Sequence, residues 1–205
     1  MTHYFSEDPG GAKRRRTISV DLAGRVVELV TAGGVFAGDG LDRGTAVLLR
    51  ESPMPTGRPR ILDLGCGYGP IALAVALHCP GAKVDAVDVN QRALELCRDN
   101  AAALGVAGRV RVFRPEEADP QTRYEEIWSN PPIRIGKAAL HALLLDWLPR
   151  LQPAGVARLV VSKNLGADTL QRWLTEQGYA TDRIATSKGF RVLVSHANPP
   201  SPRSP

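Results

Sequence analysis

The sequence of 205 residues contains few cysteines and histidines. Its three cysteines, Cys66, Cys79 and Cys97, are odd in number and have no C-x-x-C spacing, so the pattern suggests neither a disulfide framework nor a zinc site. The four histidines are scattered, without an H-x-x-x-H motif or a cluster with carboxylates. The sequence therefore predicts buried thiols and no metal.

Long hydrophobic runs are also missing. No apolar run approaches the roughly 18 residues that a membrane-spanning helix needs. The start of the chain, MTHYFSEDPGGAKRRR, has charges where a signal peptide has an apolar segment. We therefore expect a cytoplasmic protein with no membrane partner. A hydrophobic fraction of 43% at this length favours one domain with a sizeable core and a small extension.

Basic residues exceed acidic ones. The formal net charge is +5, and part of the excess lies in Lys13 to Arg16. Such a balance is compatible with a polyanionic partner such as nucleic acid. A solvated basic segment without a partner would give the same charge, so charge alone does not identify one.

The N-terminal quarter of the chain differs in pattern from the rest. Two strand-like stretches flank a turn at Asp21 to Gly24 and predict a hairpin, and residues 45–51 predict a short helix. Prolines and a glycine mark residues 52–60 as a loop. We expect three parts: an N-terminal β extension and substrate-side segment (1–52), a catalytic domain (53–197) and a disordered tail (198–205).

From Arg60 onward, strand and helix patterns alternate. The expected elements are a strand at 60–65, a helix at 70–79, a strand at 83–89, a helix at 91–105, strands at 109–113 and 124–128, a helix at 138–148, a strand at 156–162, a helix at 167–177, and strands at 179–187 and 190–196. This alternation predicts an α/β, Rossmann-like fold, with a mostly parallel sheet covered by helices on both faces and an antiparallel C-terminal hairpin.

A glycine-rich motif, DLGCGYGP, ends the first strand of this alternation. Gly65, Gly67 and Gly69 let the backbone approach a ligand closely. Asp88 follows the next strand at a distance that suits hydrogen bonds to ribose hydroxyls. The G-x-G-x-G spacing differs from that of dinucleotide enzymes, and Asp63 can receive a cationic amino group, which S-adenosylmethionine has and NAD lacks. These residues predict an S-adenosylmethionine site.

The segment SNPPIRIGK follows the strand at 124–128. Each proline lacks an N–H, has a fixed φ and pushes the residue before it into extended geometry. The loop is therefore rigid and rich in acceptors, namely the side-chain oxygen of Asn130 and the carbonyls of Pro131 and Pro132. Such a site suits a bound amine. The same triplet recurs at 198–200, so context must distinguish an amine site from a simple strand terminator.

Three motifs resemble those of class I S-adenosylmethionine-dependent methyltransferases of the small-domain group: DLGCGYGP, DVN (Asp88 to Asn90) and NPPI. The resemblance extends to residues 34–49 and 187–195, which look like site-flanking segments of guanine-N2 methyltransferases that act on 16S ribosomal RNA. HYFS at residues 3–6 looks like the start of compact relatives. The resemblance implies a Rossmann-like methyltransferase fold and S-adenosylmethionine as the cofactor.

The resemblance also implies site residues. The implied cofactor contacts are Phe36, Asp63, Gly65, Gly67, Asp88, Val89, Glu116 and Asn130, where Glu116 would bind the adenine amine unless Glu117 or Asp119 replaces it. The implied catalytic loop is Asn130, Pro131, Pro132 and Ile133, and the implied substrate contacts are Arg134, Lys137 and Arg191. Many relatives have an aromatic residue at the position of Ile133, so base stacking would fall to Phe36, Phe190 or an arginine.

The expected chemistry is the alignment of an amine with an electrophilic methyl group. If the Asn130 oxygen and the Pro131 carbonyl accept the two N–H bonds of an exocyclic amine, they stabilise the charge that develops on nitrogen. We expect methylation of guanine N2 in 16S rRNA, with ribosomal RNA or a ribosomal subunit as the partner. The alternatives are another amine (23S rRNA or tRNA guanine, adenine, cytosine, or a glutamine in a translation factor), an antibiotic self-resistance rRNA methyltransferase, and a non-catalytic RNA-binding module.

Overall fold

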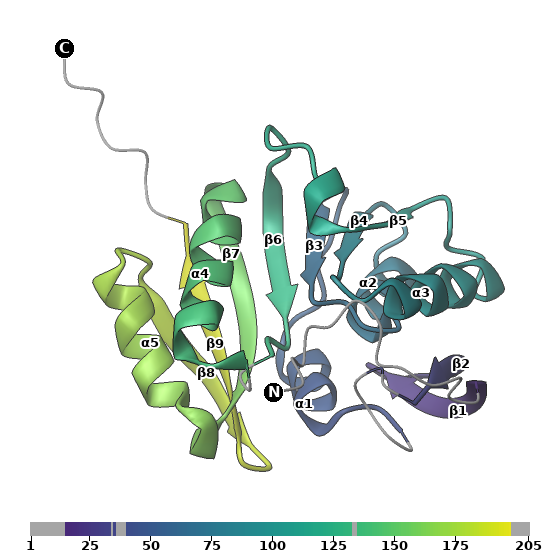
Figure 1. Cartoon of the computed structure of the whole chain (residues 1–205), viewed down its shortest axis with the longest axis horizontal. Coiled ribbons are helices and arrows are strands. Elements are labelled where there is room, and N and C mark those ends of the chain that lie inside the picture. The colour runs from purple at the N-terminus through teal and green to yellow at the C-terminus, as the bar shows by residue number, and fades with distance from the viewer. Residues whose placement is uncertain (1–14, 34, 36–39, 133–134, 198–205) are drawn as a thin grey trace.

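A seven-stranded sheet forms the centre of the molecule, and a two-stranded hairpin lies beside it (Figure 1). The structure is a computed structural model that describes residues 15–33, 35, 40–132 and 135–197. Its strands are β1 (Arg15–Leu22), β2 (Arg25–Ala32), β3 (Arg60–Leu64), β4 (Lys83–Val87), β5 (Val110–Phe113), β6 (Tyr124–Ser129), β7 (Leu151–Ser162), β8 (Thr181–Ser187) and β9 (Phe190–His196). Its α-helices are α1 (Arg43–Glu51), α2 (Pro70–His78), α3 (Gln91–Ala103), α4 (Lys137–Trp147) and α5 (Ala167–Glu176), with short 3-10 helices η1 (Pro115–Glu117), η3 (Leu148–Arg150) and η4 (Lys163–Leu165).

The strand order of the large sheet places a ligand site between β3 and β6. The order is β5-β4-β3-β6-β7-β9-β8, in which β3 to β7 are parallel to one another and β9 is antiparallel to β7 and to β8. The chain runs outward from β3 to β5 and then returns to start β6 on the other side of β3. Open α/β sheets bind ligands at such a reversal, outside the carboxyl ends of the strands.

Each face of the sheet has its own hydrophobic core. Neighbouring residues of β3 show the division, because Ile61 belongs to the core formed with α1, α2, α3 and the hairpin, whereas Leu62 belongs to the core formed with α4 and α5. Trp128 and Ile127 divide in the same way on β6. Alternate side chains of a strand point to opposite faces, so both faces must be covered by helices. The predicted Rossmann-like fold is confirmed.

Two tight turns fix the two hairpins. Ala23 and Gly24 between β1 and β2 have φ values of 54° and 89°, and Lys188 and Gly189 between β8 and β9 have values of 48° and 81°. Positive φ at both central residues is the geometry of the two-residue turn that matches the twist of paired strands. Both hairpins predicted from the sequence are confirmed.

The N-terminal hairpin packs on α2 and α3 through both apolar and polar contacts. The amide of Asn100 in α3 pairs with the backbone of Val30, because Oδ1 accepts from its N–H (2.7 Å) and Nδ2 donates to its carbonyl (3.0 Å). Leu22 and Leu29 share a core with α2 and α3. The hairpin is thus continuous with the core on that face of the sheet.

Some boundaries differ from the sequence-based expectations. Strand β4 ends at Val87 rather than continuing through Asp88 and Val89, because the carboxylate of Asp88 hydrogen-bonds in the turn that follows. Strand β7 starts at Leu151, five residues earlier than its apolar pattern indicated, and its register with β6 shifts between Tyr124 and Glu126. None of the helices in the described part of the chain has the length and hydrophobicity required to cross a membrane.

Candidate active site

The glycine-rich turn after β3 forms an open cradle at the carboxyl edge of the sheet. Gly65 and Gly67 have φ values of 77° and 56°, and a Cβ on either would meet no atom within 4 Å. The turn is tied to β4, because the N–H of Gly65 donates to the carbonyl of Val87 (2.8 Å). Gly69 has a packing role, since a Cβ there would lie 2.7 Å from Sγ of Cys97 in α3. The turn therefore leaves space for a ligand beside Gly65 and Gly67.

Asp88 closes the cradle on the β4 side. One carboxylate oxygen accepts from the N–H of Gly67 and the other from the N–H of Asn90, both at 2.9 Å. Burial raises the pKa of Asp88 above its usual value, and its backbone hydrogen bonds oppose this effect. A carboxylate oxygen can accept more than one hydrogen bond, so both remain able to bind ribose hydroxyls.

Asp63 is fully buried beneath the same turn. Its Oδ2 accepts from the N–H of Ala72 in α2 (2.9 Å), whereas its buried Oδ1 has no hydrogen-bond partner among the described residues. Burial raises the pKa of Asp63 to about 7, and the nearby charge of Asp88 adds to this effect. A buried carboxylate with an unpaired oxygen is costly unless a cation or donor meets it.

These features fit S-adenosylmethionine. The cationic amino group of its methionine part can supply the partner that Asp63 lacks, and the ribose hydroxyls can donate to Asp88. The space beside Gly65 and Gly67 permits close approach of the backbone. The residues predicted for the cofactor at Asp63, Gly65, Gly67 and Asp88 thus lie together at one edge of the sheet, and Val89 follows directly, half-buried.

The loop that begins at Asn130, here called the acceptor loop, lies next to this cradle because β6 is hydrogen-bonded to β3. The hydroxyl of buried Ser129, the last residue of β6, donates to the carbonyl of Leu64, the last residue of β3 (2.7 Å). Asn130, Pro131 and Pro132 continue from this point. The hydrogen bond therefore holds the start of the acceptor loop beside the glycine-rich turn.

The side chain of Asn130 has a defined orientation. Its Nδ2 donates to Oδ2 of Asp42 (2.6 Å) and to Oγ1 of Thr45 (3.1 Å). A carboxylate oxygen only accepts hydrogen bonds, so the nitrogen of the amide must face Asp42. No hydrogen bond to Oδ1 of Asn130 is formed by the residues that the structure describes. The oxygen is therefore free to accept a hydrogen bond from a ligand.

Asp42 and Thr45 belong to the start of α1. Asp42 is its N-cap, and the same Oδ2 accepts from the N–H of Thr45 (3.0 Å). Tight packing surrounds this point, because a Cβ on Gly44 would lie 3.1 Å from the ring of Phe190 and 3.3 Å from Nδ2 of Asn130. Phe190, one of the residues considered for base stacking, thus lies close to the Asn130 amide.

Tyr68, in the glycine-rich turn, adds a buried hydroxyl near Asp42. Its side chain is 2% exposed, and its hydroxyl has no partner among the described residues. Burial and the charge of nearby Asp42 raise the pKa of Tyr68 to about 12. Sequence reasoning missed Asp42, Thr45 and Tyr68 as site residues. Two signals were available: the site-flanking segment at residues 34–49 contains Asp42 and Thr45, and the glycine-rich motif contains Tyr68. Asp42, just before a predicted helix, was also a candidate N-cap.

The remaining predicted residues lie in varied places. Glu116 is exposed and pairs with Arg114 (2.5 Å). A hydrogen bond from its own backbone lowers the pKa of Glu116 most, and the pair with Arg114 lowers it further. Arg191 is buried on β9 and pairs with Asp168 of α5, which makes a direct substrate contact unfavourable without rearrangement. Lys137 is exposed at the start of α4. Phe36, Ile133 and Arg134 lie outside the described residues.

Comparison with known proteins identifies the family. The profile of the methyltransferase small domain matches residues 26–194. The chain belongs to this methyltransferase family. It is 30% identical to the uncharacterized protein YbxB of Bacillus subtilis (strain 168) over 194 residues, covering 93% of this chain and 96% of YbxB. It is 35% identical to ribosomal RNA small subunit methyltransferase C of Shewanella sp. (strain MR-4) over 138 residues, 64% of this chain and 39% of that enzyme.

A solved structure shares the fold over nearly the whole chain. The T. thermophilus 16S rRNA N2 methyltransferase RsmC, in complex with AdoMet and guanosine, superimposes with a TM-score of 0.78 at 22% identity, covering 93% of this chain and 52% of that one. The chain thus spans about half of RsmC from T. thermophilus and less of the Shewanella enzyme. The predicted class, an S-adenosylmethionine-dependent methyltransferase, is confirmed by the family match and by the cradle that fits the cofactor.

Proposed function

We propose that this methyltransferase modifies an exocyclic base amine of ribosomal RNA, namely guanine N2 of 16S rRNA. The observation that carries the proposal is the orientation of Asn130, whose amide nitrogen is bound by Asp42 and Thr45. This leaves the oxygen as an acceptor at the sheet edge where the cofactor cradle lies. An acceptor held in this way suits an N–H donor. It does not suit a deprotonated hydroxyl or a carboxylate, because neither has a hydrogen to donate.

The proposed mechanism rests on alignment. S-adenosylmethionine supplies an electrophilic methyl group when it is bound. The oxygen of Asn130 and the carbonyl of Pro131 accept the two N–H bonds of the substrate amine, which directs the nitrogen lone pair toward the cofactor and stabilises the positive charge that develops. Because the two prolines fix the loop and Ser129 anchors it to β3, the acceptors are preorganised. Orientation of this kind can contribute roughly 7–11 kcal/mol to lowering a barrier.

The choice of guanine in 16S rRNA is supported by the relatives. The Shewanella relative is a ribosomal RNA small subunit methyltransferase, and the fold neighbour is an N2 methyltransferase solved with guanosine. The net charge of +5 is favourable for binding a polyanion. Phe190 lies near Asn130 and provides an aromatic face for the base. Such a substrate places the enzyme in the cytoplasm, with ribosomal RNA or a small subunit as its partner.

Nucleoside analysis of a deletion strain tests the proposal. We expect 16S rRNA from the strain to lack one N2-methylguanosine that the parent strain contains, as quantified by mass spectrometry after digestion. The wild-type gene should restore it, and a gene encoding Asn130→Ala should not. Unchanged N2-methylguanosine in the deletion strain would contradict the proposed substrate.

A further inference from the structure

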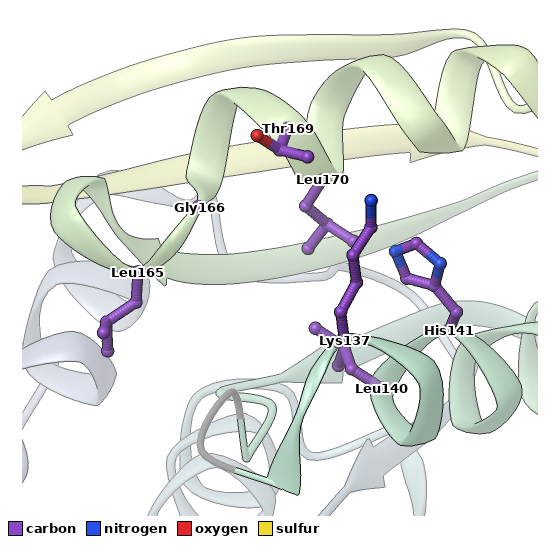
Figure 2. A pocket seen from close by; sticks show the side chains of 7 residues that line it. All are labelled: Lys137, Leu140, His141, Leu165, Gly166, Thr169 and Leu170. Atoms are coloured by element: carbon purple, nitrogen blue, oxygen red, sulfur yellow. The ribbon is translucent and has the colours of Figure 1, made fainter.

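A pocket lies between α4 and α5, at the same edge of the sheet as the acceptor loop. It is lined by Lys137, Leu140, His141, Leu165, Gly166, Thr169 and Leu170 (Figure 2). The α4 residues follow the end of β6 and the others follow the end of β7, and these strands are parallel neighbours. The carboxyl ends of parallel strands meet at one edge, so the pocket lies at the edge of the sheet where β6 ends and leads to Asn130, Pro131 and Pro132.

The lining combines an apolar floor with polar side chains. Leu140 and Leu170 are buried, whereas Leu165 is 48% exposed at the edge of the pocket. Figure 2 shows Lys137 and His141 extending from α4 toward Thr169 and Leu170 on α5. The volume of about 200 Å³ is smaller than the ~300–1,000 Å³ typical of sites for drug-sized ligands. A single nucleotide unit, with part of it outside the pocket, matches this size.

Lys137 gives the pocket its charge. The ring of His141 stacks on Trp173, with centroids 3.6 Å apart. Partial burial lowers the pKa of His141, and the nearby charge of Lys137 adds to this effect. A lowered pKa favours the neutral imidazole, so Lys137 supplies the permanent positive charge among the lining residues. Within the described part of the chain, Lys137 has no ion-pair partner, whereas nearby Asp168 pairs with Arg191 and lies 4.0 Å from Arg183. One unpaired cation beside an apolar floor is complementary to one phosphodiester and its base.

We propose that this pocket binds a nucleotide adjacent to the methylated one in the RNA strand. The phosphate lies at Lys137 and within reach of the Thr169 hydroxyl, and the base lies against Leu140, Leu165 and Leu170. The proposal rests on the proposed function, because it requires an RNA substrate. It extends the RNA contact from the acceptor loop across α4 to α5 and assigns Leu165 and Thr169 to substrate recognition.

Two substitutions test the pocket in the full-length protein. Lys137→Gln removes the charge, and Leu165→Glu introduces a repulsive charge at an exposed position, where we expect folding to be preserved. The control, Lys83→Gln, makes the same change at an exposed lysine that starts β4, at the opposite edge of the sheet. Affinity for a short fluorescein-labelled single-stranded oligoribonucleotide is measured over a series of salt concentrations, and the KM for small ribosomal subunits and the S-adenosylmethionine Kd are measured in parallel.

We expect Lys137→Gln to make the slope of log affinity against log salt less steep by about 0.7, the value for one phosphate contact on a single strand. Leu165→Glu should raise the KM for subunits about tenfold, which corresponds to ~1.4 kcal/mol, without changing cofactor affinity. If the wild-type protein methylates subunits but both pocket variants behave like Lys83→Gln, the pocket proposal is overturned and the proposed function is not. A wild-type protein that neither binds the RNA nor methylates subunits would overturn the proposed function as well.

Discussion

At the scale of single residues, the acceptor loop depends on a carboxylate distant in sequence. Asn130 contributes an amide whose two ends differ chemically, and only one orientation leaves the oxygen free to accept a hydrogen bond. Asp42 selects that orientation through a 2.6 Å hydrogen bond to Nδ2. Hydrogen bonds to a charged group contribute about 1.5–3 kcal/mol, which is enough to keep the amide in one orientation.

Asn130→Ala should lower kcat by roughly 10²–10³, by analogy with the removal of one preorganised dipole that stabilises a transition state. Cofactor affinity and folding should survive, because the substitution removes no contact to the glycine-rich turn. Single-turnover methyl transfer and thermal unfolding, measured on the same preparation, check this. A destabilised variant with full turnover would make Asn130 a turn residue only.

Asp42→Ser separates the orienting role of Asp42 from its capping role. Serine is a good N-cap, so α1 should keep its cap to the N–H of Thr45, but the shorter side chain loses the carboxylate that binds Asn130. We expect kcat to fall by about tenfold or more, with the melting temperature and cofactor affinity near wild-type values. Full turnover in this variant would show that Asn130 is oriented without Asp42. Asp42→Ala, which removes the cap as well, should in addition lose about 1 kcal/mol of stability.

The carboxyl of Asp63 gives the cofactor site a pH dependence. Its pKa in the folded protein is about 7, above its ordinary value of 3.8, so its contribution to stability is full at low pH and is lost as the pH rises through 7. Binding of a cationic amino group favours the carboxylate. Cofactor affinity should therefore fall by roughly tenfold between pH 7 and pH 5.5, a range in which the amino group stays protonated.

Asp63→Asn should remove both effects. The variant should bind S-adenosylmethionine more weakly at pH 7, with little pH dependence of Kd. Between pH 5 and pH 8 the cofactor-free wild-type protein should lose roughly 2–3 kcal/mol of unfolding free energy, and the cofactor-free variant should not. Calorimetric titration and thermal unfolding across this range measure the two quantities. Equal pH profiles for variant and wild type would show that Asp63 does not titrate there.

Residues within contiguous motifs could be located from the sequence, but their partners could not. Asp63, Asp88 and Asn130 lie at strand ends, and parallel strands bring such ends together. Asp42 and Thr45 lie 88 and 85 residues from Asn130, and only the packing of α1 against the sheet edge brings them into contact. For Arg191 the sequence could not show the surroundings of the residue, because nothing in its position indicated that it would be buried against Asp168.

At the scale of elements, an ionic cluster joins the strands behind the site. Asp85 in β4 is buried and accepts from Arg60 of β3, from Arg111 of β5 (both 3.0 Å) and from the hydroxyl of Tyr124 of β6 (2.9 Å). Burial and the neighbouring Asp85 raise the pKa of Tyr124. The apolar pattern predicted these strands, but it could not show that a charge inside one of them would link its neighbours.

Asp85→Ala should lower the free energy of unfolding by about 3 kcal/mol, because it leaves the buried Tyr124 hydroxyl unpaired. The two arginines are 38% and 51% exposed and can be hydrated, which limits the cost. Urea unfolding measures the change. Asp182→Ala, at a side chain that is 77% exposed, is the control and should change stability by less than about 0.5 kcal/mol. Turnover of folded Asp85→Ala should match wild type, and a lower kcat would mean that the cluster also shapes the active site.

At the scale of the whole molecule, strand order determines where the chemistry occurs. The return of the chain from β5 to β6 places the acceptor loop directly beside the glycine-rich turn, and α1 covers the same edge (Figure 1). Strand and helix alternation was sufficient to predict the sheet and its two helical layers. The contact between α1 and the acceptor loop was not predictable in this way, because it depends on how the N-terminal segment folds back over the sheet.

We propose that this geometry methylates guanine N2 in 16S rRNA. The most direct test supplies purified protein with small ribosomal subunits, naked 16S rRNA and S-adenosylmethionine that has a deuterated methyl group, followed by digestion and mass spectrometry of nucleosides and peptides. We expect the label in N2-methylguanosine from 16S rRNA. Label in another nucleoside or in a glutamine side chain, or no transfer to either substrate, would contradict it.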